Sequence, residues 1–371
     1  MTILILALSG RALAQAARRT GADVIVADLF GDEDTRRLAR RYVLPGSLEH
    51  GVDGEALLDW VRSLDVPLIG IVYGTGFEAS PELLGELARI APLIGNRPET
   101  VAAMKDPDAF ATLLKRLGLP HPEIAASPRP GVRWLRKRRG GCGGTHIEVA
   151  IPRPTTADPR YYFQVVAPGH AVSALFVADG KAARVLGLSE QWTAPSLGQP
   201  FRFGGSAGPL QVAATLAAEI DEACQAITAA AGLVGLNSLD TLVDGERFTV
   251  LEVNPRPSGT LDLFLHRADM DLWSYHLRGV QGELPEIALS IAEDARAAVI
   301  LYADQARAIP ASFDWGAGVA DIPAPLSRVA AGMPICTVIA DGPDTDNARA
   351  VAERRAAELL SRLPLLVEQP A

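Results

Sequence analysis

Apolar segments that alternate with amphipathic segments over the first hundred residues constrain the fold of this chain most strongly. The apolar runs have strand length and are ILILAL (residues 3–8), VIVAD (24–28) and PLIGIVYG (67–74). Helical patterns such as GRALAQAARRTG and PELLGELARIA lie between and after them. Continuous apolar strands that alternate with amphipathic helices are typical of a parallel sheet covered on both faces. The sequence therefore predicts an α/β protein whose N-terminal domain is a doubly wound parallel sheet.

Such a sheet could hold a dinucleotide, and Asp28 at the end of the second predicted strand fits that interpretation. A dinucleotide site needs a glycine-rich first turn, because only glycine lets the backbone approach the pyrophosphate closely. The first turn here is LSGRALAQ, with one glycine and no G-x-G-x-x-G pattern. A scaffold or substrate-binding domain is the better interpretation, and an NAD-dependent oxidoreductase is the less favoured alternative.

Composition and charge exclude several classes of protein. The 371 residues are 48% hydrophobic and 21% charged, as in a soluble globular protein, and carry a formal net charge of -9. A general nucleic-acid binder needs surplus lysine and arginine, so we expect no nucleic-acid partner. The apolar start MTILILALSGR is too short to span a membrane and has no basic residue before it, so we expect no membrane association. Three widely spaced cysteines favour a reduced, cytoplasmic protein.

The pattern of elements divides the chain into four segments. We expect an α/β domain over residues 1–97, a small lobe over 98–165, a large lobe over 166–290 and a β-rich tail with a final helix over 291–371. One helix that carries both Lys105 and Lys115 is predicted to open the small lobe. The strands YYFQVV and AVSALFVADG, separated by APGH, are predicted to form a hinge between the lobes.

A predicted hairpin in the large lobe gathers polar groups on buried strands. Its strands are NSLDTLV (237–243) and FTVLEVN (248–254) around DGER, and Glu252 and Asn254 share a face because side chains alternate along a strand. Asp240 joins that face if the turn holds an odd number of residues. Two carboxylates so close would raise one pKa sharply unless a cation lies between them. Oxygen ligands alone favour Mg²⁺ held with nucleotide phosphates, whereas the alternative is a solvated hairpin edge.

The stretch LEVNPRPSG, preceded by GLNSLD, resembles the metal-binding signature of the ATP-grasp superfamily. The resemblance extends over the order of elements from the N-terminus to about residue 285, and it implies an ATP-grasp fold with two α+β lobes behind the N-terminal domain. It implies that ATP and Mg²⁺ (or Mn²⁺) bind, with Asp240, Glu252 and Asn254 as metal ligands. By the same resemblance Arg256 is catalytic, because it would meet the γ-phosphate or an acyl-phosphate.

The resemblance also implies where ATP binds. Lys105 in AAMKDP matches the family's lysine ahead of the small lid-like subdomain, and Lys137 matches its strand lysine before a glycine-rich loop. Arg138 stands where many relatives have proline, so either basic side chain could face ATP. The hinge lacks the ribose-binding acid of many relatives, so the sequence leaves the nucleotide preference open, and ATP remains the default. The implied ATP contacts are Lys105, Lys137, Arg138, Gly141, Gly143, Gly144, Gln164, Val165 and Val166.

ATP-grasp enzymes mostly activate a carboxylate as an acyl-phosphate that an amine then attacks, so the resemblance implies a ligase with a small-molecule carboxylate and amine as partners. The chain could form a homodimer. The expected substrate contacts, which could equally be turn residues, are Gly76, Phe77, Glu78, Ser258 and Gly259. DLFGDEDTRR, YGTGFEASP and GMPICTV resemble ATP-grasp proteins of pterin- and methanofuran-type one-carbon metabolism, which favours a glutamyl ligase of cofactor biosynthesis. A non-catalytic ATP-binding module is the alternative.

Overall fold

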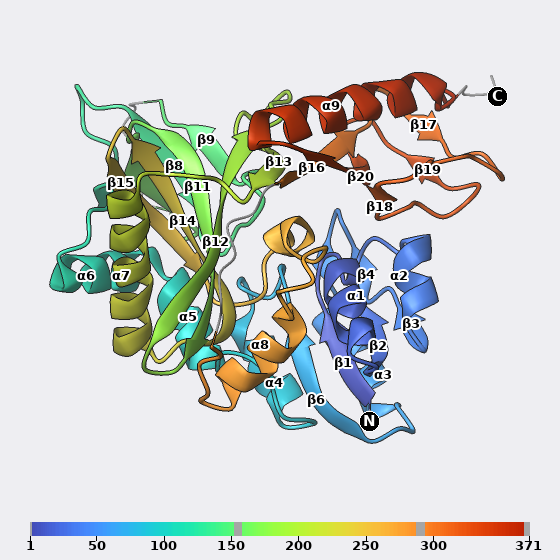
Figure 1. Cartoon of the computed structure of the whole chain (residues 1–371), viewed down its shortest axis with the longest axis horizontal. Coiled ribbons are helices and arrows are strands. Elements are labelled where there is room, and N and C mark those ends of the chain that lie inside the picture. The colour runs from blue at the N-terminus through green and yellow to red at the C-terminus, as the bar shows by residue number, and fades with distance from the viewer. Residues whose placement is uncertain (1, 152–157, 287–293, 367–371) are drawn as a thin grey trace.

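The N-terminal part of the chain is built on a parallel sheet, as predicted. The computed structural model describes residues 2–151, 158–286 and 294–366, and Figure 1 shows their arrangement. The strand order is β3-β2-β1-β6, with every pair parallel. The bounds are β1 (Thr2–Leu6), α1 (Arg11–Arg19), β2 (Asp23–Ala27), α2 (Glu33–Leu38), β3 (Arg41–Val43), α3 (Gly54–Arg62), β6 (Leu68–Tyr73) and α4 (Pro81–Ala88), with a small hairpin of β4 (Gly46–Ser47) and β5 (Gly51–Val52).

Alternate residues of β1 face two different hydrophobic cores. Ile3 and Ile5 pack with Leu13 of α1, whereas Leu4 and Leu6 pack in a core that includes Leu57 of α3. All five residues of β1 are buried. A strand covered on both faces explains why its sequence is continuously apolar. The predicted doubly wound sheet is therefore confirmed.

The small lobe is a four-stranded antiparallel sheet that follows two short helices. Its strand order is β7-β10-β8-β9. The predicted single helix is wrong, because one helix ends at Lys105 and the next begins at Pro107. Proline has no amide hydrogen to continue a helix, and the Asp106 side chain accepts from the Ala109 amide to start a new one. The bounds are α5 (Pro98–Lys105), α6 (Pro107–Leu117), β7 (Ile124–Ala125), β8 (Trp134–Arg138), β9 (Ile147–Val149) and β10 (Tyr161–Val165).

The large lobe and the tail share one antiparallel sheet, ordered β15-β14-β11-β12-β13-β16-β20-β18. Helix α7 packs on this sheet beside the hairpin, and α9 covers β16 and β20 (Figure 1). The bounds are β11 (His170–Asp179), β12 (Ala183–Thr193), β13 (Phe203–Gly208), α7 (Ala214–Ala231), β14 (Val234–Asp244), β15 (Arg247–Asn254), the 3-10 helix η1 (Gly259–Leu263), α8 (Leu272–Val280), β16 (Ala295–Tyr302), β17 (Arg307–Ala308), β18 (Val319–Ala320), β19 (Arg328–Val329), β20 (Pro334–Gly342) and α9 (Thr345–Arg362).

The sheet continues from the predicted large lobe into the predicted tail, because β13 pairs with β16 through Gly205 and Val299. The predicted boundary at residue 290 lies outside the described residues, and the division into four segments stays a prediction. Within the part of the chain that the structure describes, no helix combines the length and apolar character needed to cross a bilayer.

Candidate active site

The hairpin of β14 and β15 brings the predicted metal ligands together by a route that the sequence did not indicate. Its turn has two residues, Gly245 and Glu246, so Thr241 lies opposite Val250. A two-residue turn alone would put Asp240 and Glu252 on opposite faces. A β-bulge shifts the register between Asp240 and Thr241, and Asp240 then pairs with Glu252. The odd-numbered turn on which the shared face was conditional is not present, but the bulge places the two carboxylates on one face.

A tight set of hydrogen bonds links these ligands to one another and to Lys105. Asn254 donates from Nδ2 to Asp240 Oδ2 at 2.8 Å, and Ser173 donates to Asp240 Oδ1 at 2.6 Å. Lys105 at the end of α5 donates from Nζ to Glu252 Oε2 at 2.8 Å and to Asn254 Oδ1 at 3.0 Å. Lys105, expected on the nucleotide phosphates, thus lies among the proposed metal ligands.

The two carboxylates have opposite pKa shifts. Burial and the charge of Glu252 raise the pKa of Asp240 to about 6. Burial also acts to raise the pKa of Glu252, but the charges of Lys105 and Lys137 outweigh it and lower that pKa to about 2. Two lysines therefore compensate Glu252, whereas at Asp240 the charges of Lys105 and Arg256 are outweighed by burial and by Glu252. Three oxygen-bearing side chains on one face, with an under-compensated carboxylate among them, fit a divalent cation.

Lys137 and Arg138 are consecutive residues of β8, so their side chains point to opposite faces of the strand. This geometry helps to decide which of them meets ATP. Lys137 is buried, and its pKa is lowered by burial while the nearby charges of Glu252 and Asp240 oppose that change. Arg138 is exposed on the strand but contributes to the pocket beside it. The Lys137 ammonium is thus the one that lies near the carboxylate pair.

A pocket lies between α6, the glycine loop, β10 and β15, next to Glu252. Of the predicted ATP contacts, Lys105, Arg138, Gly141 and Gln164 line it. The lining also includes residues that the sequence analysis did not single out: Phe110, His121, His146, Tyr162 and Val250. Burial lowers the pKa of His146 to about 4, so its ring is neutral at physiological pH. In the sequence, the signal that could have pointed to His146 is its position two residues after Gly144 of the glycine cluster.

The other predicted ATP contacts form hydrogen bonds or close contacts within the protein. The amide groups of Val165 and Val166 donate to the carbonyls of Glu123 and Arg133, both at 2.9 Å, so hydrogen bonds to adenine would use their carbonyl oxygens. Gly143 accepts from the Phe203 amide at 3.0 Å. A Cβ on Gly144 would lie 1.9 Å from the Phe201 carbonyl oxygen, and its φ is +74°, so only glycine fits there.

Arg256 and Glu78 form a buried ion pair between the hairpin exit and the loop after β6. Arg256 Nε donates to Glu78 Oε1 at 2.5 Å, and Nη2 donates to Asn254 Oδ1 at 3.2 Å. The two side chains are only 6% and 2% exposed. Burial acts to raise the pKa of Glu78, but the charges of Arg256 and Lys105 outweigh it and lower that pKa. Glu78, expected on substrate, thus holds the predicted catalytic arginine.

The remaining predicted substrate residues lie around this ion pair. The amide of Gly76 donates to Glu78 Oε2 at 2.6 Å. Phe77 is 2% exposed and packs in a core of the N-terminal domain, so its ring is directed away from solvent. Ser258 shares a 2.6 Å hydrogen bond with Thr260, and Gly259 begins η1.

Comparisons with known proteins agree with this architecture. Residues 106–260 match the model of the ATP-grasp domain family. The carbamoyl phosphate synthase large chain of Rubrobacter xylanophilus is 24% identical in an alignment of 240 residues that covers 58% of this chain and 22% of that protein. The chain thus spans about a fifth of the length of this curated relative.

Several solved structures cover nearly the whole chain. The biotin carboxylase domain of Hydrogenobacter thermophilus 2-oxoglutarate carboxylase, a dimer in complex with MgADP, ADP and bicarbonate, superposes with a TM-score of 0.73 at 12% identity and covers 97% of this chain and 90% of that one. N5-carboxyaminoimidazole ribonucleotide synthetase from Thermus thermophilus gives a TM-score of 0.69 at 19% identity, with 98% and 99% covered. The chain therefore has the ATP-grasp fold, with a doubly wound parallel sheet at its N-terminus.

Proposed function

We propose that this protein is an ATP-dependent carboxylate–amine ligase that forms an amide through an acyl-phosphate and releases ADP. The convergence of Asp240, Glu252 and Asn254 on one face of the hairpin carries this proposal. Two carboxylates that face each other with too little positive charge between them are costly unless a cation binds there. The named relatives act on small molecules, and a small-molecule carboxylate and amine are the proposed partners here.

Asp240, Glu252 and Asn254 would hold Mg²⁺, or Mn²⁺ in its place, and the ion would supply positive charge to the phosphates of ATP. Lys105 and Lys137 border the same space. Lys105 now provides the counter-charge of Glu252. We expect Lys105 to serve the phosphates when the ion takes over that role, which reconciles its position with the resemblance.

Arg256 would stabilise the charge that develops on the transferred phosphoryl group. Its guanidinium is held by Glu78 through Nε, so one edge of the donor fork is fixed. An arginine fixed in advance loses little entropy when the charge develops, which is the requirement for electrostatic catalysis. The glycine loop would exclude water that could hydrolyse the acyl-phosphate.

A finer assignment is a glutamyl ligase of methanofuran- or pterin-type cofactor biosynthesis. It rests on the three sequence stretches DLFGDEDTRR, YGTGFEASP and GMPICTV, while the relatives described above have other substrates in their names. Bicarbonate, present in one of those structures, is a further candidate acid.

The test is a screen for ADP release with magnesium-ATP and pairs drawn from a panel of acids and a panel of amines. Glutamate and bicarbonate belong among the acids. A ligase releases ADP only when both members of a pair are present, and Glu252→Gln abolishes the release. ADP release that ignores the acid and the amine, or ATP binding with no pair-dependent release, would contradict the ligase proposal and favour a binding module.

A further inference from the structure

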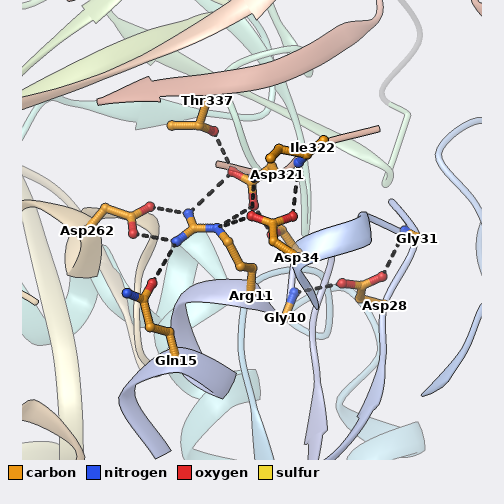
Figure 2. A network of polar contacts seen from close by, with 11 residues as sticks. Gly10, Arg11, Gln15, Asp28, Gly31, Asp34, Asp262, Asp321, Ile322 and Thr337 are labelled. Atoms are coloured by element: carbon orange, nitrogen blue, oxygen red, sulfur yellow. Dashed lines mark hydrogen bonds and ion pairs between the residues drawn. The ribbon is translucent and has the colours of Figure 1, made fainter. Parts of the chain in front are cut away.

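Five aspartates from three parts of the chain gather around Arg11 at the start of α1. Arg11 donates from Nη1 and Nη2 to the two carboxylate oxygens of Asp262, at 2.7 and 2.5 Å. Its Nε donates to Asp321 Oδ1 at 2.8 Å, and Asp34 Oδ2 lies 3.8 Å from the same atom. Figure 2 shows how α1, the segment after β2, η1 and the tail meet here. We call Asp28, Asp32, Asp34, Asp262 and Asp321 the acidic cluster.

Four members of the acidic cluster have hydrogen-bond donors. Asp262 accepts from Arg11, and Asp28 accepts from the amides of Gly10 and Gly31 at 3.0 and 3.1 Å and from the Tyr42 hydroxyl. Asp34 accepts from the amides of Asp321 and Ile322 at 2.9 and 3.0 Å. Asp321 also accepts from Thr337 at 2.5 Å and from Ser9 at 3.1 Å. These carboxylates are therefore part of the folded framework.

Asp32 is the exception. It is 2% exposed, and its Oδ2 has no hydrogen-bond partner among the described residues. Asp32 stands at the N-cap of α2, where an aspartate normally accepts from the first turn, yet it makes no such bond. Burial and the charges of Asp321, Asp28 and Asp34 raise the pKa of Asp32 to about 9. A buried carboxyl group that faces other acids without a donor is costly unless another group satisfies it.

Short stretches of chain connect the acidic cluster to the proposed substrate side of the active site. The Leu8 amide donates to the Thr75 carbonyl at 2.7 Å, which ties the loop after β1 to the loop that carries Glu78. Asp262 lies in η1, which begins at Gly259, three residues after Arg256. The cluster is therefore connected through Leu8 to the loop of Glu78 and through η1 to the segment of Arg256.

We propose that Asp32, together with the acidic cluster, binds a protonated amino group carried by one of the two substrates, an inference that rests on the proposed ligase function. An ammonium group brings positive charge and three N–H donors, which is what Asp32 lacks. A metal ion fits less well, because the neighbouring carboxylates already hold donors. Moreover, within the described ranges no group of three His, Cys, Asp or Glu side chains is arranged to hold a metal. The Glu33 amide donates to the Ile322 carbonyl at 2.8 Å, so the tail is hydrogen-bonded to the start of α2, next to Asp32 in the chain.

The first test measures binding without turnover. The melting temperature of the whole protein is recorded in ethylammonium chloride, potassium chloride and magnesium chloride at matched ionic strength. Ethylammonium should raise it for the wild type by mass action, and Asp32→Asn should lose that increase. Asp53→Asn is the matched control, because Asp53 is an exposed N-cap aspartate at α3. An equal increase in Asp32→Asn, no increase in the wild type, or the same increase with potassium or magnesium would overturn the proposal.

The second test uses an acid–amine pair that supports ADP release. Asp32→Asn should raise the KM of the substrate with the protonated amino group at least tenfold and leave kcat within about threefold, because it removes an anchor and spares the reacting groups. The KM of ATP should not change. Absence of ADP release with every pair would count against the ligase function alone, since the ethylammonium test would still decide on the site. A fall in kcat with an unchanged KM would refute the anchoring role.

Discussion

Replacement of Asp240 by asparagine should stabilise the protein without nucleotide at neutral pH, although it removes a proposed magnesium ligand. The folded-state pKa of Asp240 is raised to about 6 from an ordinary value of 3.8. The folded state therefore holds the proton more tightly than the unfolded chain does. The resulting stabilisation is complete below pH 3.8 and is lost as the pH rises through 6, so the ionised Asp240 destabilises the fold above that pH.

The size of the effect follows from the two pKa values. The difference between the folded and the ordinary pKa of Asp240 means that its ionisation destabilises the fold by about 3 kcal/mol at about pH 7.5. Asparagine has no such cost and keeps the bond from Ser173, but it loses one acceptor for Asn254, which costs about 1–1.5 kcal/mol. The net gain of about 1.5–2 kcal/mol corresponds to about 2 °C in a chain of 371 residues. At about pH 5, protonation already relieves about half of the cost, so the gain should vanish.

The assay is thermal unfolding of wild type and Asp240→Asn at both pH values without nucleotide. Asp244→Asn is the control, because Asp244 is exposed at the end of the same strand and its replacement also removes one negative charge. Magnesium-ATP should raise the melting temperature of the wild type and have little effect on Asp240→Asn. If Asp240→Asn melts below the wild type by the same margin at both pH values, the carboxylate is not the unsatisfied charge that we infer.

Three further perturbations address other parts of the site. Glu252→Gln should lose most of the magnesium-dependent part of the ATP-induced rise in melting temperature, and a full rise would remove Glu252 from the metal site. Arg256→Ala should lower turnover about a hundredfold and destabilise the fold by about 3–5 kcal/mol, because it leaves Glu78 buried and unpaired. Adding Glu78→Gln should restore stability and leave turnover low, whereas recovery of both would reduce Arg256 to a structural role. Cleavage by trypsin at Arg138 or Arg139 should slow when magnesium-ATP is added, and an unchanged rate would argue against a closing glycine loop.

Local patterns predicted the elements on which the site is built, and they failed where geometry depends on one residue. The continuous apolar character of β1 followed from burial on both faces, so the parallel sheet could be predicted. The break at Pro107 could have been predicted from proline alone, but the helical periodicity across it masked the capping role of Asp106. The bulge next to Asp240 has no such signal, because an extra residue in a strand changes the register without changing the composition.

Long-range partners were beyond the reach of sequence patterns. Glu78 and Arg256 are 178 positions apart, and Arg11 and Asp321 are 310 apart. No periodicity relates such residues, since their contact depends on how the N-terminal sheet packs against the eight-stranded sheet. Glu78 could be predicted to lie near the substrate, but its role as the partner of Arg256 emerged only from the folded arrangement.

Asp240 and Asp32, two carboxyl groups whose pKa values are raised, lie at the two proposed binding sites. Asp240 lies beside Glu252, whose charge Lys105 already balances. Asp32 lies near three other aspartates, and its own Oδ2 receives no hydrogen bond. A fold selected for stability alone would replace either carboxylate by a neutral group of the same size, and the structure has room for asparagine at both positions. Retaining both costs the ligand-free protein stability, because each site disfavours the ionised form of its carboxyl group. A binding partner can return that free energy, because it stabilises only the folded state in which the carboxylates converge. Magnesium-ATP at Asp240 and an ammonium group at Asp32 would therefore each bind a carboxyl group whose ionised form is disfavoured in the ligand-free fold.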